Sequence, residues 1–145
     1  MWAEVSMGGG AGREKVADGL RRVSPRVLVV DDDGDLAEML AKTLRREGAE
    51  VTVSGTVAAA IAAIGRLGWD VLICDLGLPD GSGTAVLRDA RSRLGRDCKL
   101  VVSSGQDPDV VAGAAADTGA DAILLKPYGS DDVEVLLRAL TPTGT

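Results

Sequence analysis

One stretch of the sequence, residues 71–83, constrains the fold more than any other. Four apolar residues, Val71 through Cys74, run directly into Asp75, and a turn rich in proline and glycine follows at once. An uninterrupted apolar run that ends at turn residues is typical of a strand buried on both faces of a parallel sheet. Asp75 would then lie at the carboxyl end of that strand, where open α/β sheets place their ligands.

Four further strands are predicted, and each of the five strands precedes a helix. Continuous apolar runs lie at 27–30, 100–102 and 122–125, whereas 49–54 alternates between apolar and polar residues and is expected at the edge of the sheet. Helical periodicity is found over 34–47, 57–67, 84–94, 108–118 and 133–140. Strands and helices that alternate in this way predict an α/β fold, a doubly wound five-stranded parallel sheet with helices on both faces and right-handed crossovers.

The local signals at the helix ends agree with this assignment. Asp33 and Thr56 are the expected N-caps of the first two helices, and Gly48 is expected to stop the first. The helix over 108–118 is the weakest of the five. It contains Gly113, which costs about 1 kcal/mol relative to alanine in a helix interior, and only Val110 and Val111 offer large apolar anchors.

The domain organisation is simple. Residues 1–24, which include the linker-like Gly8–Gly12 segment, are expected to form a flexible N-terminal extension, followed by one domain over 25–141 and a short tail over 142–145. No output domain follows Leu140 in this sequence. A stand-alone regulator and the excised part of a larger protein both stay open.

The composition excludes several classes of function. The formal charge is −6 and no basic stripe is found, which argues against direct binding of nucleic acid. No apolar run approaches a membrane span and the N-terminus lacks a signal-peptide core, so a cytoplasmic protein without membrane contact is expected. Cys74 and Cys98 stand far apart in apolar surroundings and are interpreted as two reduced, buried thiols. The absence of histidine excludes histidine catalysis and histidine metal ligation.

Polar residues follow the continuous apolar strands: Asp31, Asp32, Asp75, Ser104 and Lys126. Because parallel strands point their carboxyl ends to one edge, we expect these side chains to meet there. Three carboxylates at one edge repel one another unless a cation joins them, and a few hard oxygen ligands with room for water suit Mg²⁺. A purely structural interpretation, in which residues 31–33 cap the following helix, explains Asp33 but leaves Asp31 and Asp32 unexplained.

These residue types together suit one chemistry. A metal ion and a lysine can share the charge of a phosphoryl group while a serine hydroxyl bonds one of its oxygens. Asp75 would be the nucleophile that accepts the group, as carboxylates do when aspartyl phosphates form.

On these motifs the sequence resembles the receiver domain of the two-component response regulators, from about Arg26 to Leu140. The acidic pair of that family matches Asp31 and Asp32, and its phosphoacceptor matches Asp75 within the Asp75–Gly83 segment, including Pro79 and Gly83 at the family's spacing. The family's hydroxyl residue matches Ser104, and its lysine matches Lys126 in Lys126-Pro127-Tyr128. The resemblance implies a flavodoxin-like sheet of order 2-1-3-4-5 and makes the backbone carbonyl of Gly77 a further metal ligand.

The sequence departs from the family's pattern at one functional position. Many receivers carry tyrosine or phenylalanine three residues before the lysine, as a rotating switch, and here that residue is Ile123. An aliphatic side chain has neither a hydroxyl nor a ring to report through, so the aromatic half of the usual switch is not expected to operate.

The resemblance implies a phosphorylation-dependent signalling switch rather than an enzyme. Asp75 would take a phosphoryl group, with Mg²⁺ bound, from a sensor histidine kinase or a phosphotransfer protein, and the domain would catalyse only its own phosphorylation and slow hydrolysis. The 105–140 face is the expected surface for a homodimer or an output partner. Two alternatives stay open: an Mg²⁺-dependent phosphatase or phosphoryl-transfer enzyme on a related fold, and a pseudo-receiver that only binds partners.

Overall fold

A computed structural model describes residues 24–140 of the chain. The expected N-terminal extension and C-terminal tail lie outside this range, apart from Ser24. Within it, no helix is both long and apolar enough to cross a membrane.

The central feature is one parallel sheet of five strands in the order β2-β1-β3-β6-β7. The strands are β1 (Arg26–Val30), β2 (Glu50–Ser54), β3 (Val71–Asp75), β6 (Lys99–Ser104) and β7 (Ala122–Leu125). Two short strands, β4 (Gly77–Leu78) and β5 (Gly81–Ser82), form a separate antiparallel hairpin that the sequence reasoning did not predict. With the hairpin set aside, the order is 2-1-3-4-5, so the predicted doubly wound, flavodoxin-like fold is confirmed.

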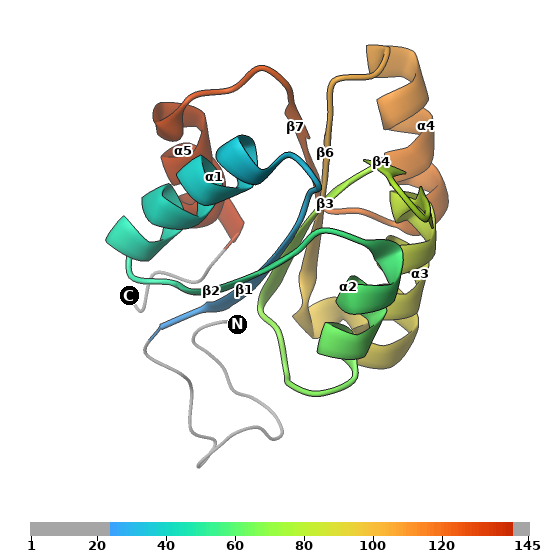
Figure 1. Cartoon of the computed structure of the whole chain (residues 1–145), viewed down its shortest axis with the longest axis horizontal. Coiled ribbons are helices and arrows are strands. Elements are labelled where there is room, and N and C mark those ends of the chain that lie inside the picture. The colour runs from blue at the N-terminus through green and yellow to red at the C-terminus, as the bar shows by residue number, and fades with distance from the viewer. Residues whose placement is uncertain (1–23, 141–145) are drawn as a thin grey trace.

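Helices cover both faces of this sheet. They are α1 (Gly34–Arg46), α2 (Val57–Ile64), α3 (Gly83–Leu94), α4 (Pro108–Thr118) and α5 (Ser130–Leu140), with a 3₁₀ turn η1 at Gly95–Asp97. Figure 1 shows α1 and α5 together on one side of the strands and α2, α3 and α4 on the other. The carboxyl ends of all five strands therefore open onto one edge between the two helical layers.

Two aliphatic cores explain the continuous apolar strands. Alternate residues of β1, Leu28 and Val30, pack toward α2 and α3, while Val27 and Val29 pack toward α1 and α5. Residues 71–74 of β3 divide between the same two cores. Because both faces of β1 and β3 are covered at 27–30 and 71–74, these positions are all apolar until the strand ends.

The predicted helix signals operate as expected. The Asp33 carboxylate accepts a hydrogen bond from the Leu36 N–H at 3.2 Å, and the Thr56 hydroxyl accepts one from the Ala59 N–H at 3.0 Å. Gly48 follows the end of α1 with a φ of 97°, a conformation that strongly favours glycine.

The end of α2 differs from the prediction, because the helix stops at Ile64 and Leu67 is 49 % exposed. Trp69, rather than Leu67, is the residue after α2 that is buried in the core. Its side chain is 5 % exposed, and its indole N–H donates to the Ala63 carbonyl at 3.0 Å. Glycines at 65 and 68 favour this early end to the helix.

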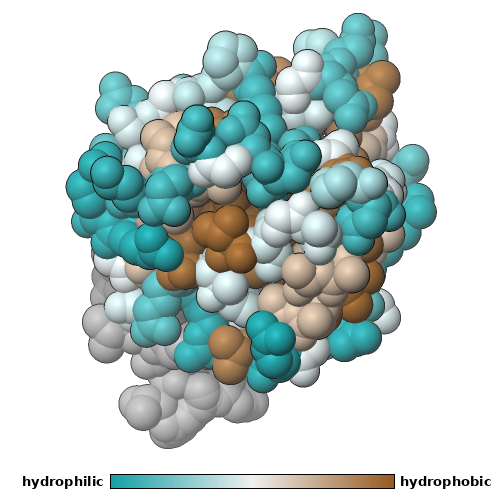
Figure 2. All heavy atoms as spheres, viewed as in Figure 1, coloured by the Kyte–Doolittle hydropathy of each residue, from teal (hydrophilic) through white to brown (hydrophobic). Residues whose placement is uncertain are grey.

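Apolar residues also reach the surface on the strand β7 and the helix α4. Leu124 is buried, but Ile123 and Leu125 are 40 % and 43 % exposed, because β7 is an edge strand and alternate side chains point to opposite faces. Val110 of α4 is 53 % exposed, so the expectation that it anchors this helix is wrong and Val111 alone is buried among its large apolar side chains. In the view of Figure 2, further apolar surface lies over α2 and along β2, the opposite edge strand.

Both cysteines are buried and free, as predicted. Burial raises the pKa of the Cys74 thiol far above its ordinary value, with the charges of Asp75 and Asp31 adding to the effect. Burial likewise raises the pKa of Cys98 to about 12. Neither side chain is a thiolate at neutral pH, so both act as small apolar core residues.

Two glycine-to-alanine variants test how closely α3 approaches β3. A Cβ atom on Gly83 would overlap the backbone oxygen of Asp75, whereas one on Gly113 would meet nothing within 4 Å. We expect Gly83→Ala to lower the free energy of unfolding by about 1–3 kcal/mol through overpacking against the backbone. The matched Gly113→Ala variant should raise it by up to about 1 kcal/mol. Urea denaturation measures both, and equal stabilities for Gly83→Ala and the unchanged protein would contradict the close approach.

Candidate phosphoryl and metal site

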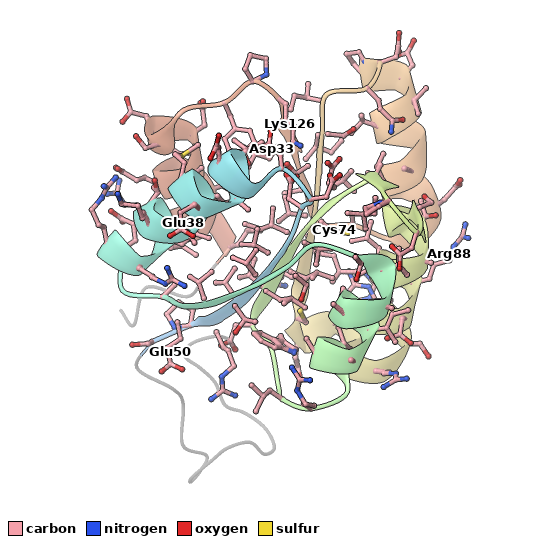
Figure 3. All side chains as sticks on the ribbon, viewed as in Figure 1. Asp33, Glu38, Glu50, Cys74, Arg88 and Lys126 are labelled. Atoms are coloured by element: carbon pink, nitrogen blue, oxygen red, sulfur yellow. The ribbon has the colours of Figure 1, made fainter. Side chains whose placement is uncertain are left out.

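The sheet brings the predicted polar residues to one edge. Asp31 follows β1 directly, Asp75 is the last residue of β3, Ser104 is the last of β6, and Lys126 follows β7. Figure 3 shows Lys126 and the cap residue Asp33 at this carboxyl end of the strands, with Cys74 within the molecule below them. At β1 and β3 the local cause is the same: the two cores cover the apolar run, and the first polar residue comes where the cores end.

Lys126 joins two of the carboxylates. Its ammonium group lies 2.9 Å from Oδ2 of Asp31 and 3.0 Å from Oδ2 of Asp75. Both carboxylates are largely buried, with Asp31 4 % and Asp75 9 % exposed. Asp31 is held further by the backbone N–H of Asp33, which donates to its Oδ1 at 2.9 Å.

The electrostatics of Lys126 follow from these contacts. Burial alone would lower the pKa of its ammonium group, but the hydrogen bonds and charges of Asp31 and Asp75 outweigh burial and raise it. Lys126 is therefore a cation at neutral pH, and deprotonation that would break the bridge requires a pH above the ordinary lysine range.

A third carboxylate, that of Asp32, completes an acidic cluster. One oxygen from each of Asp31, Asp32 and Asp75 lies within 4.8 Å of the others. Asp32 is exposed, and no hydrogen bond or ion pair joins its side chain to another residue of the 24–140 range. Hard oxygen donors with one side open to water fit Mg²⁺, which keeps several waters when bound to proteins.

Ser104 lies at the same edge but is not bonded to Asp75. Asp75 pairs with Ser103 across β3 and β6, so Ser104 stands one residue further along its strand. The Ser104 hydroxyl accepts a hydrogen bond from the Gln106 N–H at 3.1 Å, and its carbonyl accepts one from the Lys126 N–H at 2.9 Å. The serine is therefore fastened to the start of the β6–α4 loop and to the lysine that contacts the acids.

The loop after Asp75 folds back on the strand that precedes it. The Gly77 N–H donates to Oδ1 of Asp75 at 3.4 Å, and Gly77 pairs with Ser82 in the β4–β5 hairpin. The Gly83 N–H donates to the Leu76 carbonyl at 2.9 Å, which closes the loop at its base. Gly77 thus lies beside the acidic cluster.

Asp80 is a site-loop residue whose contacts sequence reasoning missed. Its two carboxylate oxygens accept hydrogen bonds from the N–H groups of Val57 at 2.7 Å and Ala58 at 3.1 Å. These two bonds hold the pKa of Asp80 below its ordinary value, although the side chain is exposed. The partners are more than twenty residues away in sequence, so no local motif could have indicated this contact.

Two buried hydroxyls lie near the site on the α5 side. Burial raises the pKa of the Tyr128 phenol, the neighbouring Ser103 hydroxyl lowers it in part, and the charge of Asp31 raises it further. Neither hydroxyl has a well-aligned hydrogen bond within residues 24–140.

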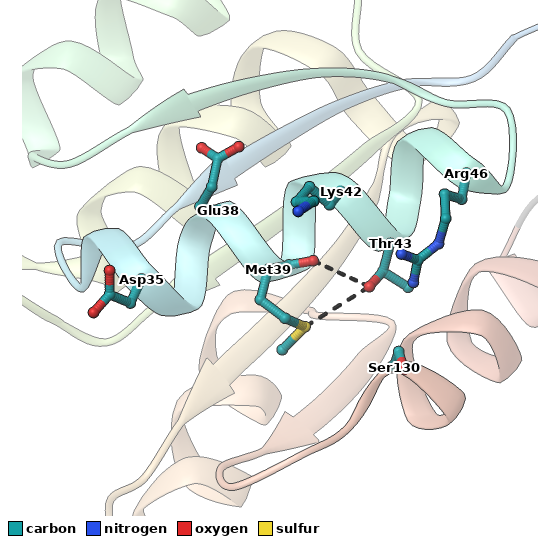
Figure 4. A pocket seen from close by; sticks show the side chains of 7 residues that line it. All are labelled: Asp35, Glu38, Met39, Lys42, Thr43, Arg46 and Ser130. Carbon is teal, nitrogen blue, oxygen red and sulfur yellow. Dashed lines mark hydrogen bonds between the residues drawn. The ribbon is translucent and has the colours of Figure 1, made fainter.

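A separate hollow of about 380 Å³ runs along the outer side of α1. Its lining is of mixed charge and comprises Asp35, Glu38, Met39, Lys42, Thr43, Arg46 and Ser130. Figure 4 shows the Thr43 hydroxyl between the Met39 carbonyl, 3.0 Å away, and the Met39 sulfur. No member of the acidic cluster lines this hollow, so it is separate from the chemistry at the strand ends.

Comparison with protein families gives a match over most of the chain. The family model described as the response regulator receiver domain matches residues 27–138. Sensory transduction protein RegX3 of Mycolicibacterium smegmatis is 37 % identical over 118 residues, covering 81 % of this chain and 51 % of RegX3. DNA-binding response regulator MtrA of Mycolicibacterium paratuberculosis is 37 % identical over 114 residues, covering 79 % of this chain and 50 % of MtrA. The chain thus spans about half the length of these relatives.

Solved structures share the fold. A CheY-like response regulator receiver domain protein from Methanospirillum hungatei JF-1 superposes with a TM-score of 0.75 at 28 % identity, covering 80 % of this chain and 92 % of that one. A response regulator from Burkholderia pseudomallei, solved with a phosphorylated aspartic acid, a calcium ion and citrate, superposes with a TM-score of 0.72 at 30 % identity. That match covers 81 % of this chain and 67 % of the other.

Two alanine variants distinguish an acid whose charge is paired with Lys126 from an acid whose charge is not. Asp31→Ala removes a buried partner of Lys126 and should lower the free energy of unfolding by about 1–3 kcal/mol. Asp32→Ala removes an unbalanced charge and should raise it by about 0.2–1 kcal/mol when no metal is added. Thermal unfolding in the presence of a chelator measures both, and a clear loss of stability in Asp32→Ala would mean that this acid has a structural role.

Proposed function

The chain belongs to the response regulator receiver family, and we propose that Asp75 is the residue on which it accepts a phosphoryl group. Receiver domains of this family are signalling domains of two-component systems. The observation that carries the assignment of Asp75 is the Lys126 ammonium group 3.0 Å from its carboxylate, beside two further acids. Asp75 is the acid of the cluster that combines the lysine contact with a position at the end of the central strand.

The residues of the cluster divide the work of the transfer. An oxygen of Asp75 forms a bond to phosphorus while the bond from phosphorus to the donor's histidine nitrogen breaks. Lys126 would hold a positive charge where negative charge gathers on the phosphoryl oxygens. The Ser104 hydroxyl oxygen accepts from the Gln106 N–H, and its own O–H would donate to one of those oxygens. The domain would thereby promote its own phosphorylation by the donor and the slow hydrolysis by water that removes the group.

Asp31, Asp32, Asp75 and the backbone carbonyl of Gly77 would hold Mg²⁺. Bound there, Mg²⁺ supplies the charge neutralisation that lets an anionic phosphoryl group approach three carboxylates. Asp31 is already fixed by Lys126 and the Asp33 N–H, while the exposed Asp32 is free to reorient toward the ion.

The partners follow from this chemistry. The donor we propose is the phosphohistidine of a sensor histidine kinase or a phosphotransfer protein. We propose the 105–140 face as the surface for a homodimer or output partner, which the exposed apolar residues Val110, Ile123, Leu125 and Val135 support. The receiver itself is proposed to contact neither nucleic acid nor membrane, in a cytoplasmic setting. DNA binding named for MtrA concerns a protein of which this chain matches one half.

Acceptor identity is tested with a small phosphodonor. Acetyl phosphate and Mg²⁺ should add one phosphoryl group, located on Asp75 by tandem mass spectrometry after borohydride reduction. Asp75→Asn should abolish the label, whereas Asp35→Asn, which removes an exposed acid of α1, should leave it intact. Label retained in Asp75→Asn, or found on Asp31 or Asp32, would overturn the assignment. An unlabelled wild-type protein would favour the pseudo-receiver alternative.

Phosphorylation is expected to change α4 more than any other helix. Only Val111 and Thr118 of α4 are buried, and Gly113 has open space around it, so this helix opens easily. It also follows directly on Ser104 and Gly105, and a Cβ on Gly105 would lie 3.6 Å from Cβ of Lys126.

Hydrogen exchange with and without beryllofluoride measures this change. We expect amides 106–118 to alter their exchange rates by at least about tenfold when beryllofluoride and Mg²⁺ bind, since a change of 1.4 kcal/mol in opening free energy suffices. Identical exchange in this segment, with changes confined to α1 or α3, would contradict the expectation.

A further inference from the structure

The tip of the β4–β5 hairpin is tied to a helix that lies far away in sequence. Asp80, between the two short strands, accepts hydrogen bonds from the N–H groups of Val57 and Ala58 at the start of α2. These groups have no partner within the helix, and a carboxylate is favoured at a helix N-terminus by the orientation of the peptide dipoles. Both carboxylate oxygens of the exposed Asp80 side chain are thereby hydrogen-bonded to α2.

Capping alone does not account for this contact, because α2 has a cap of its own. The Thr56 hydroxyl accepts a hydrogen bond from the Ala59 N–H at 3.0 Å, the position that a local N-cap satisfies. Asp80 instead takes the two remaining N–H groups from outside the helix. Gly81, with a φ of 153°, packs beside it: a Cβ there would lie 3.6 Å from Cγ2 of Val57. The tip of the hairpin therefore packs against the first turn of α2.

The segment before α2 is fastened to the acidic pair on its other side. The Asp31 N–H donates to the Ser54 carbonyl at 3.0 Å. A Cβ on Gly55 would lie 4.0 Å from the Asp31 carbonyl oxygen and from Cα of Asp32. The β2–α2 connection is thus in contact with the β1–α1 connection that carries both acids.

These contacts form a continuous series around the acidic cluster. It runs from Asp31 through Ser54 to the start of α2, across Asp80 to the hairpin, and back through Gly77 to Asp75. The other links are backbone contacts, the chain itself and the hydrogen bond from the Gly77 N–H to the buried Asp75 carboxylate, so Asp80 is the one link made by an exposed side chain. Without it the hairpin keeps the Gly77–Ser82 pairing, the Gly83–Leu76 hydrogen bond, and the packing of Leu78 against the core and of Gly81 beside Val57.

We infer that Asp80 is a positioning residue, which fixes the 76–82 loop against α2 and so holds Asp75 and the Gly77 carbonyl in place for metal binding. The inference rests on the proposed Mg²⁺ site. It acts through geometry rather than contact, because Asp80 is bonded to α2 and not to any carboxylate of the cluster.

Calorimetric titration with Mg²⁺, paired with thermal unfolding, tests this role. Asp80→Ala should weaken Mg²⁺ binding by about tenfold or more, as loss of a residue that orients metal ligands typically does. Thr56→Ala is the matched control for the helix, since it removes the local cap of α2 and leaves the hairpin tether intact. It should lower the melting temperature at least as much as Asp80→Ala does, while Mg²⁺ affinity stays within about twofold of wild type.

Two further variants separate the tether from simple loss of charge. Asp80→Asn removes the charge but keeps an acceptor oxygen for one of the two N–H groups, so its Mg²⁺ affinity should lie between those of Asp80→Ala and wild type. Asp35→Ala removes an equal charge from the exposed start of α1 and should weaken binding by no more than about twofold, because exposed charges are screened.

The outcomes distinguish this inference from the proposed function. If wild type binds Mg²⁺ and Asp80→Ala binds it equally well, or if Thr56→Ala loses as much affinity as Asp80→Ala, the positioning role is overturned and the metal site stands. If Asp80→Asn binds no better than Asp80→Ala, charge rather than the tether is responsible, and the role is again overturned. Wild-type protein that takes up no Mg²⁺ overturns the proposed site and this inference with it.

Discussion

The arrangement at the edge of the sheet depends on one lysine that separates two buried carboxylates. Asp31 and Asp75 end neighbouring strands, so the fold forces their charges together, and Lys126 from β7 lies within 3.0 Å of both. Two unit charges about 4 Å apart interact by about 4 kcal/mol at the effective dielectric of a protein surface, which is too much to leave unbalanced. Three carboxylates against one ammonium group leave a formal charge of −2 at the cluster, which one divalent cation would neutralise. The lysine offsets part of the repulsion between Asp31 and Asp75, and the charge that it leaves at the cluster would favour a divalent cation.

Most of the fold could be predicted because its determinants are local in sequence. The apolar run of β3, the caps Asp33 and Thr56, and the polar residues at the strand ends each report their structural role within a few positions. The failures have a common cause, which is competition between distant residues. Leu67 continues the helical period of α2, but Trp69 takes the buried place, and Val110 fits the period of α4 although no neighbouring element covers it. Periodicity predicts which residues could face a core and cannot tell which of two candidates the core will accept.

The site, like the fold, has one part that could be predicted from the sequence and one part that could not. Parallel strands bring their carboxyl ends together by construction, so the approach of Asp31, Asp32, Asp75 and Lys126 follows from the strand assignments. The contacts that orient these side chains do not follow from the strand assignments. The Ser104 hydroxyl is bonded to Gln106 rather than to the acids, and the Asp80 carboxylate crosses to α2. Both contacts depend on how loops lie against helices, which is decided by side-chain geometry and leaves no repeat or spacing in the sequence.

Replacement of the usual aromatic residue by Ile123 alters how a signal can leave this site. An aromatic ring reports a change by moving between an inward and an outward position, whereas Ile123 is already 40 % exposed and has no hydroxyl to bond within the protein. One connection between the acidic cluster and the outer face is the backbone of residues 104–105 and 126. The Lys126 N–H donates to the Ser104 carbonyl, and Gly105 lies against the aliphatic part of the lysine side chain. A displacement of either Ser104 or Lys126 toward a phosphoryl group would therefore move the other, together with the loop that begins α4. Coupling of this kind needs no rotating side chain, because the two groups that would bind the phosphoryl oxygens are joined directly to each other.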